Sequence, residues 1–234
     1  METTPQPDDR KAILSALADP QRLRIVDALA LSDRSPSELS HALDLPSNLL
    51  AHHVGVLVEA GAVVRRRSEG DGRRSYLALA WDQPLVAATV AHGDAIGACR
   101  VVFVCTANSA RSQFAASLFA RQSDLPVASA GTAPAPVINP HAIAELARHG
   151  LAPLSPVPTA LASELRTGDL VVTVCDNARE AIDGHTRLHW SVPDPARASA
   201  GGSQDDDSTT AFAEAFAQIE PRVQRLAAAL TNGS

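Results

Sequence analysis

One stretch in the middle of the chain constrains the fold more than any other. Residues 100–105 read RVVFVC, a β-branched, apolar run that is typical of a fully buried strand. Small and polar residues follow at 106–112, and an amphipathic helix is expected over residues 112–121. A strand, a short loop and a helix N-terminus in this order predict an α/β fold whose site lies at the carboxyl ends of parallel strands.

The loop between this strand and this helix has the residues of an oxyanion site. Cys105 and Arg111 are separated by five residues, a spacing that can wrap successive backbone N–H groups around a tetrahedral oxyanion while the guanidinium binds it bidentately. The same field stabilises a thiolate, so Cys105 is the predicted nucleophile. Ser112 can hydrogen-bond that thiolate, and Asn108 suits the left-handed backbone that such a loop requires. The predicted oxyanion-binding residues are Thr106, Ala107, Asn108, Ser109, Ala110 and Arg111. The alternative interpretation is a buried cysteine that ends a strand beside a surface arginine.

The rest of the second half alternates between strand and helix patterns, which favours a parallel sheet. The expected elements are strands over residues 170–175 and from residue 188, and helices over residues 140–149 and 211–230. Cys175 ends one of these strands, and Asp194 precedes Pro195 in an exposed turn beyond another. Residues 201–210, which read GGSQDDDSTT, are expected to form a mobile acidic loop over or near the site.

Five motifs of this half resemble the low-molecular-weight protein tyrosine phosphatase superfamily and its arsenate reductases over residues 100–232. They are VFVCTANSARS, SAGT, NPHAIAELARHG, VVTVCD and HWSVPDP. The resemblance implies a flavodoxin-like parallel sheet flanked by helices. It also implies that Cys105 attacks arsenate or phosphate, that Arg111 and the loop amides bind the oxyanion, and that Asp194 protonates the leaving oxygen. Asn108 and Ser112 would shape and tune the loop.

Departures from the phosphatases favour a reductase. Residues 132–137 read TAPAPV where phosphatases of this group have aromatic walls, and Ala196 stands where they have a tyrosine. Gln113, Cys175 and the HW pair are typical of the reductases. One feature opposes this, because Ile182 occupies the place of the second shuttle cysteine of thioredoxin-coupled reductases. Cys175 is therefore either the thiol that resolves the arsenic adduct on Cys105 or a core residue.

The cysteine content and the hydropathy of the chain bear on which cofactor it binds and in which compartment it works. The three cysteines are too few for a disulfide framework, and an odd number leaves one without a partner. Cys99 is expected to pack in the interior. We expect no bound cofactor and no metal, but an external thiol reductant, either thioredoxin or a low-molecular-weight thiol. No apolar run approaches the roughly 18 residues of a membrane helix, so we expect a cytoplasmic protein without a membrane partner.

The first half predicts short helices followed by a hairpin. Helices are expected over residues 20–31 after the N-cap Asp19, over residues 36–43 after a capping box at Ser35, and over residues 47–61, capped by Ser47 and ended by Gly61. Strands are expected over residues 62–67 and 73–80, around a turn at residues 69–72 whose two glycines permit positive φ. These elements predict a winged helix-turn-helix, mostly α with a β-hairpin, that reads DNA with the helix of residues 47–60.

Residues 10–80 resemble the arsenic-repressor family of winged-helix regulators. The stretches that carry the resemblance are LADPQRLRIVDALA, ELSHALDLP and LLAHHVGVLVEAGAVVRRR. It implies a homodimer on duplex DNA. By position, the residues facing bases or nearby phosphates are Ser47, Asn48, Leu49, Ala51 and His52, and those touching phosphates are Arg66, Arg67, Arg73 and Arg74. Ala51 and Gly55 depart from the family pattern.

The charge balance leaves a second interpretation open for this half. The net charge is −6 and is spread evenly along the chain, so any nucleic-acid surface must be local. The alternative to a DNA reader is a protein-interaction module with a solvated arginine hairpin. An apolar helix over residues 83–98 is expected to serve as dimer and bridge helix.

Together these patterns predict a two-domain chain, with a DNA-binding domain over residues 1–97 and an oxyanion thiol enzyme over residues 98–234. The predicted function is a transcriptional regulator fused to a thiol-dependent arsenate reductase. The alternatives are a regulator whose second domain only senses arsenate or phosphate, and a low-molecular-weight phosphatase.

Overall fold

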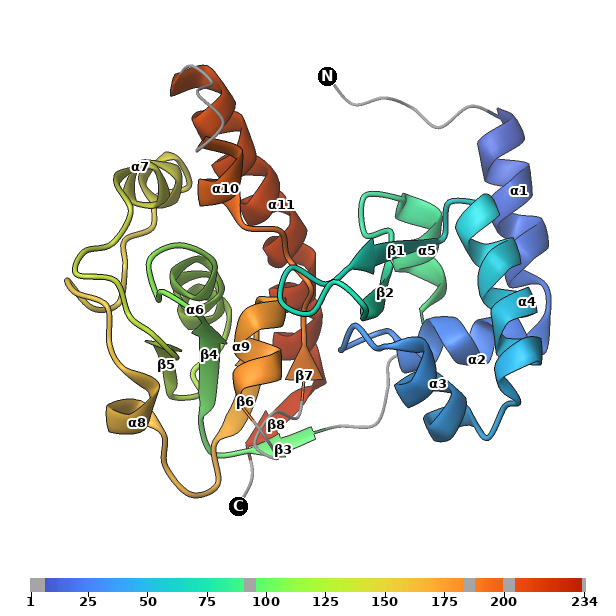
Figure 1. Cartoon of the computed structure of the whole chain (residues 1–234), viewed down its shortest axis with the longest axis horizontal. Helices are drawn as coiled ribbons and strands as arrows, with labels where there is room; N and C mark the ends of the chain where they lie inside the picture. Colours follow the sequence, from blue (N-terminus) through green and yellow to red (C-terminus); the bar gives the residue numbers. More distant parts are fainter. Residues whose placement is uncertain (1–6, 91–95, 183–187, 200–204, 233–234) are drawn as a thin grey trace. The chain divides into compact units, whose positions relative to one another are not determined.

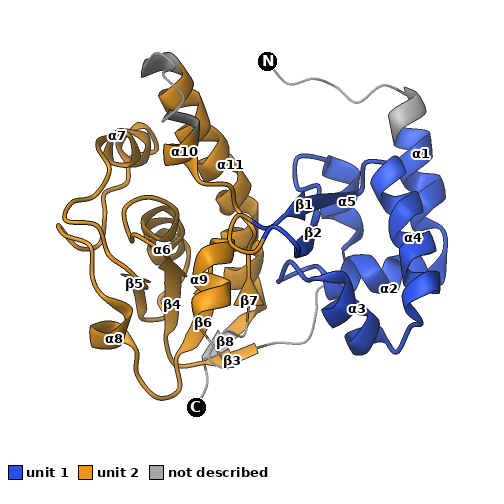
Figure 2. Ribbon diagram, in the orientation of Figure 1, with its two compact units in different colours: residues 1–68, 72–93 blue, residues 69–71, 94–234 orange. Residues whose placement is uncertain are grey.

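A computed structural model describes residues 7–90, 96–182, 188–199 and 205–232 (Figure 1). The chain forms two compact units, one of Met1–Ser68 with Gly72–Gly93 and one of Glu69–Asp71 with Asp94–Ser234 (Figure 2). The domain boundary at residue 97 stays a prediction. Within the described ranges, no helix combines the length and apolar character needed to cross a bilayer.

The first unit packs helices and a hairpin around an apolar core. Its elements are α1 (Pro7–Leu17), α2 (Pro20–Ala28), α3 (Pro36–Leu43), α4 (Ser47–Glu59), β1 (Val63–Arg67), β2 (Ser75–Leu79) and α5 (Pro84–Thr89). Asp19 caps α2 by accepting hydrogen bonds from the N–H groups of Gln21 and Arg22, and Ser35 and Glu38 form the predicted capping box of α3. The fully buried side chains of Ile25, Leu39 and Leu57 belong to the core that joins these helices.

Local details of this unit correct the sequence interpretation. Ser47 is the first residue of α4 and not its cap, because the N-cap position is Pro46, which has no side-chain hydrogen-bonding group. Gly61 ends the helix at φ +73 as predicted. Gly70 and Gly72 do not have positive φ. A Cβ at Gly70 would instead overlap the Glu180 side chain, so the requirement there is space.

The expected long helix over residues 83–98 is wrong. Helix α5 covers only Pro84–Thr89, and β3 (Ile96–Ala98) follows as an extended segment. β3 pairs in parallel with β8 (Leu230–Asn232), so the segment is held by a strand from the far end of the chain. The part of the prediction on residues 91–95 lies outside the described residues.

The second unit is an α/β fold, as predicted. Its parallel sheet has the order β5-β4-β6-β7 (Figure 1). The strands are β4 (Val101–Cys105), β5 (Val127–Gly131), β6 (Leu170–Thr173) and β7 (Leu188–His189). The helices are α6 (Arg111–Gln122), α7 (Pro140–Arg148), α8 (Leu161–Glu164), α9 (Asp176–Ala181), α10 (Pro195–Ser199) and α11 (Asp205–Ala229).

The core of this unit fixes the strand that carries the site. All five residues of β4 are buried. The ring of Phe103 lies 5.7 Å from that of Phe119 on α6 and 5.6 Å from that of Trp190, centroid to centroid. Burying each such ring contributes roughly 1.5–3 kcal/mol. The end of β4, and with it Cys105, is therefore held by the packing of this buried strand and its aromatic cluster.

Two further expectations about this unit need correction. The acidic stretch at 205–207 lies in the first turn of α11 and not in a loop before it, while residues 200–204 lie outside the described residues. Acidic residues there suit the positive end of the helix dipole. Pro195 is buried at the start of α10 and does not sit in an exposed turn.

Candidate active site and nucleic-acid interface

The loop from Cys105 to Arg111 has the conformation that an anion site needs. Asn108 adopts φ 50, the left-handed region, as predicted. Its side chain holds the loop by donating from Nδ2 to Ser112 Oγ at 2.8 Å and accepting at Oδ1 from the N–H of Thr159 at 2.8 Å. Asn108 and Ser112 have no exposed surface. The strained residue is thus stabilised by hydrogen bonds on both ends of its amide.

The outer side of the loop is bonded to the segment that follows β5. The N–H groups of Thr132, Ala133, Ala135 and Asn139 donate to the carbonyls of Cys105, Thr106, Ala107 and Ser109 at 2.9–3.1 Å. These bonds occupy the loop carbonyls and leave its N–H groups for the inner side. Gly131 permits the approach, since a Cβ there would stand 2.7 Å from the carbonyl oxygen of Thr106.

The Cys105 sulfur is the focus of this loop. It is 2% exposed. It accepts a hydrogen bond from the N–H of Asn108 at 3.1 Å and forms one with Ser112 Oγ at 3.1 Å. Two hydrogen-bond contacts thus converge on this sulfur from inside the loop. The structure therefore brings together Cys105, Asn108 and Ser112 as the sequence predicts.

Arg111 closes the loop from a buried position, with 5% of its surface exposed. Its Nη2 lies 3.1 Å from Asp194 Oδ2, and its Nη1 donates to the carbonyl of Val192 at 2.9 Å. Burial opposes the charged form, but the negative charges of Cys175, Cys105, Asp194 and Glu69 outweigh it and raise the pKa of Arg111. The guanidinium is a fixed positive charge between Cys105 and Asp194.

Glu69 also contacts this site, although no sequence pattern predicted it there. Residues Glu69–Asp71 cluster with the second unit. Glu69 Oε2 lies 3.3 Å from Arg111 Nη1, and Oε1 accepts from the N–H of Asp194 at 3.0 Å. The Glu69 carboxylate therefore contacts Arg111 Nη1, one of the N–H donors that a bound oxyanion would use.

Cys175 lies next to the loop but is closed off from the surface. It has no exposed surface. Its sulfur is 3.5 Å from Thr106 Oγ1 and accepts from the N–H of Ala178 at 3.4 Å, as the N-cap of α9. Burial raises the pKa of the Cys175 thiol, and the charge of Cys105 adds to this, while Arg111 acts in the opposite direction. Cys99, by contrast, is exposed, so the expectation that it packs is wrong.

A buried polar chain supports Cys175 and the acid-bearing segment. His189 Nδ1 lies 3.0 Å from Thr173 Oγ1, and His189 Nε2 lies 3.2 Å from Asp176 Oδ1. Asp176 Oδ2 also accepts from the N–H of Glu69 at 2.9 Å. Burial would raise the pKa of Asp176, but its hydrogen bonds with His189, Glu69 and Ser191 outweigh burial and lower it. This chain joins β6, α9 and β7 behind the site.

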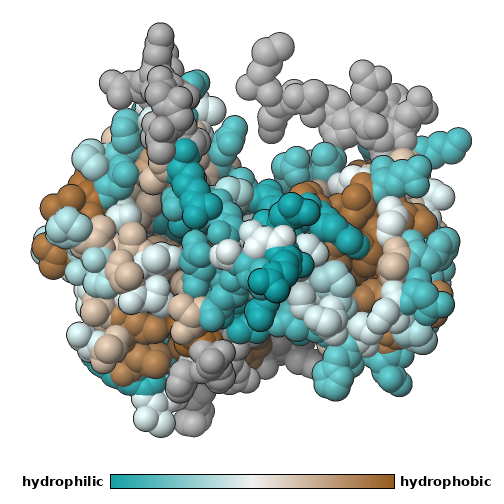
Figure 3. All heavy atoms as spheres, in the orientation of Figure 1, coloured by the Kyte–Doolittle hydropathy of each residue, from teal (hydrophilic) through white to brown (hydrophobic). Residues whose placement is uncertain are grey.

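A pocket of about 280 Å³ opens at the loop. Its lining residues are Cys105, Thr106, Ala107, Ser109, Ala110, Arg111, Asn139, Asn177, Asp194, Ala196 and Arg197. None of the described residues that line it is aromatic, as the composition of residues 132–137 suggests. The exposed large apolar side chains of this unit, Val137, Ile143, Leu154 and Val157, are not among the lining residues. In Figure 3, hydrophobic atoms gather at the left edge, where Figure 1 places the loops beside α7.

Asn139, Asn177 and Arg197 in this lining were not predicted from the sequence. Asn139 had a usable signal, since Asn before Pro140 is a helix N-cap. Asn177 and Arg197 follow Cys175 and Asp194 closely, and only the fold shows that they face the pocket. In the described parts of the chain, no group of three or more His, Cys, Asp or Glu residues is arranged to hold a metal ion.

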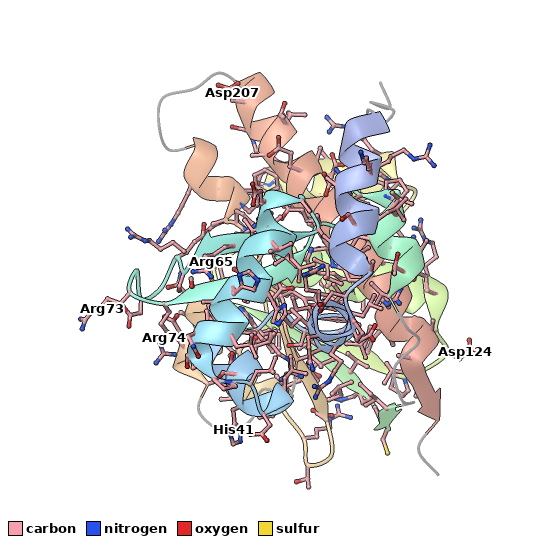
Figure 4. All side chains as sticks on the ribbon, turned by 90° about the vertical axis from the view of Figure 1, so that its right-hand side faces the viewer. His41, Arg65, Arg73, Arg74, Asp124 and Asp207 are labelled. Atoms are coloured by element: carbon pink, nitrogen blue, oxygen red, sulfur yellow. The ribbon has the colours of Figure 1, made fainter. Side chains whose placement is uncertain are left out.

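The predicted DNA-facing residues lie on exposed surfaces of the first unit. Ser47, Asn48, Leu49, Ala51 and His52 are all exposed along α4, whereas His53 and Leu50 on its other face are buried. Arg67, Arg73 and Arg74 are exposed and Arg66 is half-buried. Arg73 and Arg74 lie at the turn end of the hairpin, with Arg65 farther along (Figure 4). The helix face and three of the four hairpin arginines that the sequence predicts to meet DNA thus lie at the surface of the first unit.

The comparisons with known proteins agree with this division. A family model described as low molecular weight phosphotyrosine protein phosphatase matches residues 100–233, more than half of the chain. The chain belongs to this family. Enzymes of the phosphatase family use an active-site cysteine without a bound cofactor, in agreement with the central position of Cys105. A model described as a helix-turn-helix domain matches residues 17–66. A helix-turn-helix domain therefore precedes a phosphatase-family domain, in the order that the two sequence resemblances predict.

Individual relatives match one half or the other. An arsenate reductase of Halalkalibacterium halodurans is 29% identical over 134 residues, which are 54% of this chain and 94% of that protein. The crystal structure of an arsenate reductase from Archaeoglobus fulgidus is 28% identical, with a TM-score of 0.45, and covers 55% of this chain and 98% of that one. The solution structure of a homodimeric winged helix-turn-helix domain from Mycobacterium bovis, a possible ArsR-family transcriptional regulator, is 29% identical, with a TM-score of 0.29, and covers 31% of this chain and 65% of that one.

Proposed function

We propose that the chain is a cytoplasmic transcriptional regulator fused to a thiol-dependent arsenate reductase. The observation that carries the enzymatic half is the arrangement of two thiols around one anion loop. Cys105 Sγ is held by Asn108 N and Ser112 Oγ, and Cys175 Sγ adjoins the same loop at Thr106. The relative from Halalkalibacterium halodurans, an arsenate reductase, supports the choice of substrate.

The first step is attack of the Cys105 thiolate on arsenic. The loop N–H groups and Arg111 hold the oxyanion, with Arg111 fixed by the carbonyl of Val192. A sulfur–arsenic bond forms and an arsenic–oxygen bond breaks, and the leaving oxygen takes a proton from Asp194 and departs as water. Asp194 lines the same pocket as Cys105, which gives its carboxyl access to that oxygen.

The second step transfers two electrons to arsenic. The Cys175 thiolate attacks Cys105 Sγ, a disulfide forms between the two sulfurs, and the sulfur–arsenic bond breaks with its electron pair on arsenic, which leaves as arsenite. Burial raises the pKa of Cys175 and makes its thiolate scarce, whereas the Arg111 charge favours that thiolate. An external thiol then reduces the disulfide, because Ile182 cannot act as a further shuttle.

The test is arsenate turnover with thioredoxin and with low-molecular-weight thiols, assayed separately. We expect arsenite release that is lost in Cys105→Ser and retained in the exposed-site control Cys99→Ser. Mass spectrometry after one turnover without reductant should find a Cys105–Cys175 peptide. Normal turnover of Cys175→Ser with a small thiol would reassign Cys175 to packing, and hydrolysis of an aryl phosphate without arsenate reduction would favour the phosphatase.

The DNA-binding half is proposed on a separate observation, the exposed face of Ser47, Asn48 and His52 beside an arginine hairpin. We propose that it binds duplex DNA as a homodimer, with α4 in the major groove. If arsenate turnover is absent but arsenate or phosphate changes DNA affinity, the second unit is a sensor and not an enzyme. If residues 1–97 bind no DNA even at low ionic strength, the unit is a protein-interaction module.

A further inference from the structure

We propose that the thiol which regenerates the enzyme is a small thiol carrying a carboxylate, and that Arg197 binds this carboxylate at the mouth of the pocket. The inference rests on the proposed reductase activity. It names the class of reductant that this site takes, which the sequence left open between thioredoxin and any low-molecular-weight thiol.

The position of the two sulfurs decides where the reductant reacts. Cys105 lines the pocket of about 280 Å³, whereas Cys175 has no exposed surface and is not among the lining residues. After the Cys105–Cys175 disulfide has formed, only the Cys105 sulfur faces the opening. The incoming thiol therefore enters a pocket that Asn139, Asn177 and Arg197 also line, and of these three Arg197 is the exposed one and marks the mouth.

The mouth carries a positive charge that the first step does not use. Arg111 is committed to Asp194, Val192 and the loop. Arg197 is exposed, three residues after Asp194, and its backbone N–H donates to the carbonyl of Asp194 at 3.1 Å. Among the described residues its guanidinium has neither a hydrogen bond nor an ion pair. It is free to bind a carboxylate, for which a guanidinium offers two parallel N–H donors.

The remaining lining favours a small polar molecule. The side-chain amides of Asn139 and Asn177 offer further donors and acceptors at the opening. Because none of the described lining residues is aromatic, an aryl group gains no stacking on them. A small thiol with a carboxylate can hydrogen-bond to Arg197 and to these amides, whereas a neutral or cationic thiol makes fewer favourable contacts there.

The chemistry balances with two thiols per arsenate. The first thiolate attacks Cys105 Sγ, a mixed disulfide with Cys105 forms, and Cys175 leaves as a thiolate that takes the proton of the attacking thiol. A second thiol attacks the mixed disulfide on the sulfur of the small molecule. The products are the free Cys105 thiol and the disulfide of the reductant. Arg197 holds the carboxylate and does not touch the reacting atoms, so it is a specificity-determining residue.

The first arm of the test compares two thiols of similar size during arsenate reduction, 3-mercaptopropionate and neutral 2-mercaptoethanol. In Arg197→Gln we expect kcat/KM for 3-mercaptopropionate to fall about three- to fivefold, the upper part of the range of an exposed charge pair. The value for 2-mercaptoethanol should stay within about twofold. Arg197→Lys should retain part of the preference. Arg166→Gln, which removes an exposed arginine at the opposite end of β6, is the control of equal charge.

The second arm does not require arsenate turnover. In a Cys99→Ser, Cys175→Ser background, Cys105 is treated with 3,3′-dithiodipropionate or with the neutral 2-hydroxyethyl disulfide, and the mixed disulfide is followed by mass spectrometry. Arg197→Gln should slow only the first reagent. If arsenate is not reduced but this selectivity is found, the proposed reductase fails and carboxylate recognition by Arg197 stands.

Three results overturn the inference. In the first, Arg197→Gln slows both reagents equally, which indicates a structural role. In the second, it slows neither reagent. In the third, thioredoxin supports turnover while neither small thiol does, because the reductant then docks as a protein.

Discussion

The two units offer arginine to anions in opposite ways. In the hairpin, Arg67, Arg73 and Arg74 are exposed, so their attraction acts on any polyanion and is screened by salt. In the loop, Arg111 is 5% exposed and fixed by Asp194 and Val192, so in the proposed reductase it binds one small anion of defined geometry. The same residue type thus provides general attraction at one place and a shaped site at the other, and burial makes the difference.

The largest loss of activity is expected from a substitution of Cys105, the thiol in the loop beside Arg111. Cys105→Ser should abolish arsenate turnover, because the hydroxyl is a far weaker nucleophile, while the fold and oxyanion binding stay largely intact. Arsenite release measures the expected loss of turnover. Calorimetry measures whether oxyanion binding is retained. Cys99→Ser, at an exposed cysteine, should behave as the wild type. Full activity of Cys105→Ser would contradict the enzymatic role of the loop.

The substitution Arg111→Lys tests the comparison between the buried arginine of the loop and the exposed arginines of the hairpin. A lysine keeps the charge but cannot reproduce the planar fork held by Asp194 and Val192, so kcat/KM for arsenate should fall on the order of 100-fold. Arg121→Lys, at an exposed position of the same helix α6, should stay within about twofold. Equal effects of the two substitutions would show that the site needs only positive charge.

In the hairpin the opposite behaviour is expected. Replacing Arg66, Arg67, Arg73 and Arg74 together by Gln should weaken binding to every duplex alike. The slope of log K against log salt should fall by roughly 0.9 for each arginine that contacts a phosphate. Binding isotherms at several salt concentrations give both quantities. Asn48→Ala should instead mainly reduce the preference among sequences, and binding that does not depend on salt would contradict a phosphate role for the hairpin.

The smallest effect concerns the stability of the shaped site in acid. The pKa of Asp176 is lowered in the folded state. Its stabilisation is therefore fully present above its unfolded-state pKa of about 3.9 and is lost as the pH falls through the lower folded-state pKa. Asp176→Asn should lower the free energy of unfolding at neutral pH by about 1–3 kcal/mol and flatten its acid limb, as measured by urea titrations.

The control for this measurement is the exposed Asp124, at the surface in Figure 4. Asp124→Asn should change the unfolding free energy by less than about 0.5 kcal/mol. If both variants lose stability to the same extent and with the same pH dependence, the buried chain through His189 and Thr173 contributes nothing of its own.

Local patterns predicted the elements well where the signal lay in neighbouring residues. The capping box at Ser35 and Glu38, the cap at Asp19 and the left-handed Asn108 all depend on contacts within a few residues. The prediction of a helix over residues 83–98 failed because β3 pairs with β8, about 130 residues away in the chain. An apolar run does not tell helix from strand when its partner is so distant.

The sequence by itself determined the two-part architecture and the Cys105–Arg111 loop, because a strand, a loop and a helix N-terminus in sequence suffice to build an anion site. Only the tertiary structure placed Gly131, Glu69 and Arg197 at that site. These residues lie on separate segments that no local pattern joins. Gly131 and Arg197 meet because parallel strands carry all their carboxyl ends to one edge of the sheet, where the connecting loops converge, whereas Glu69 comes from the turn between β1 and β2.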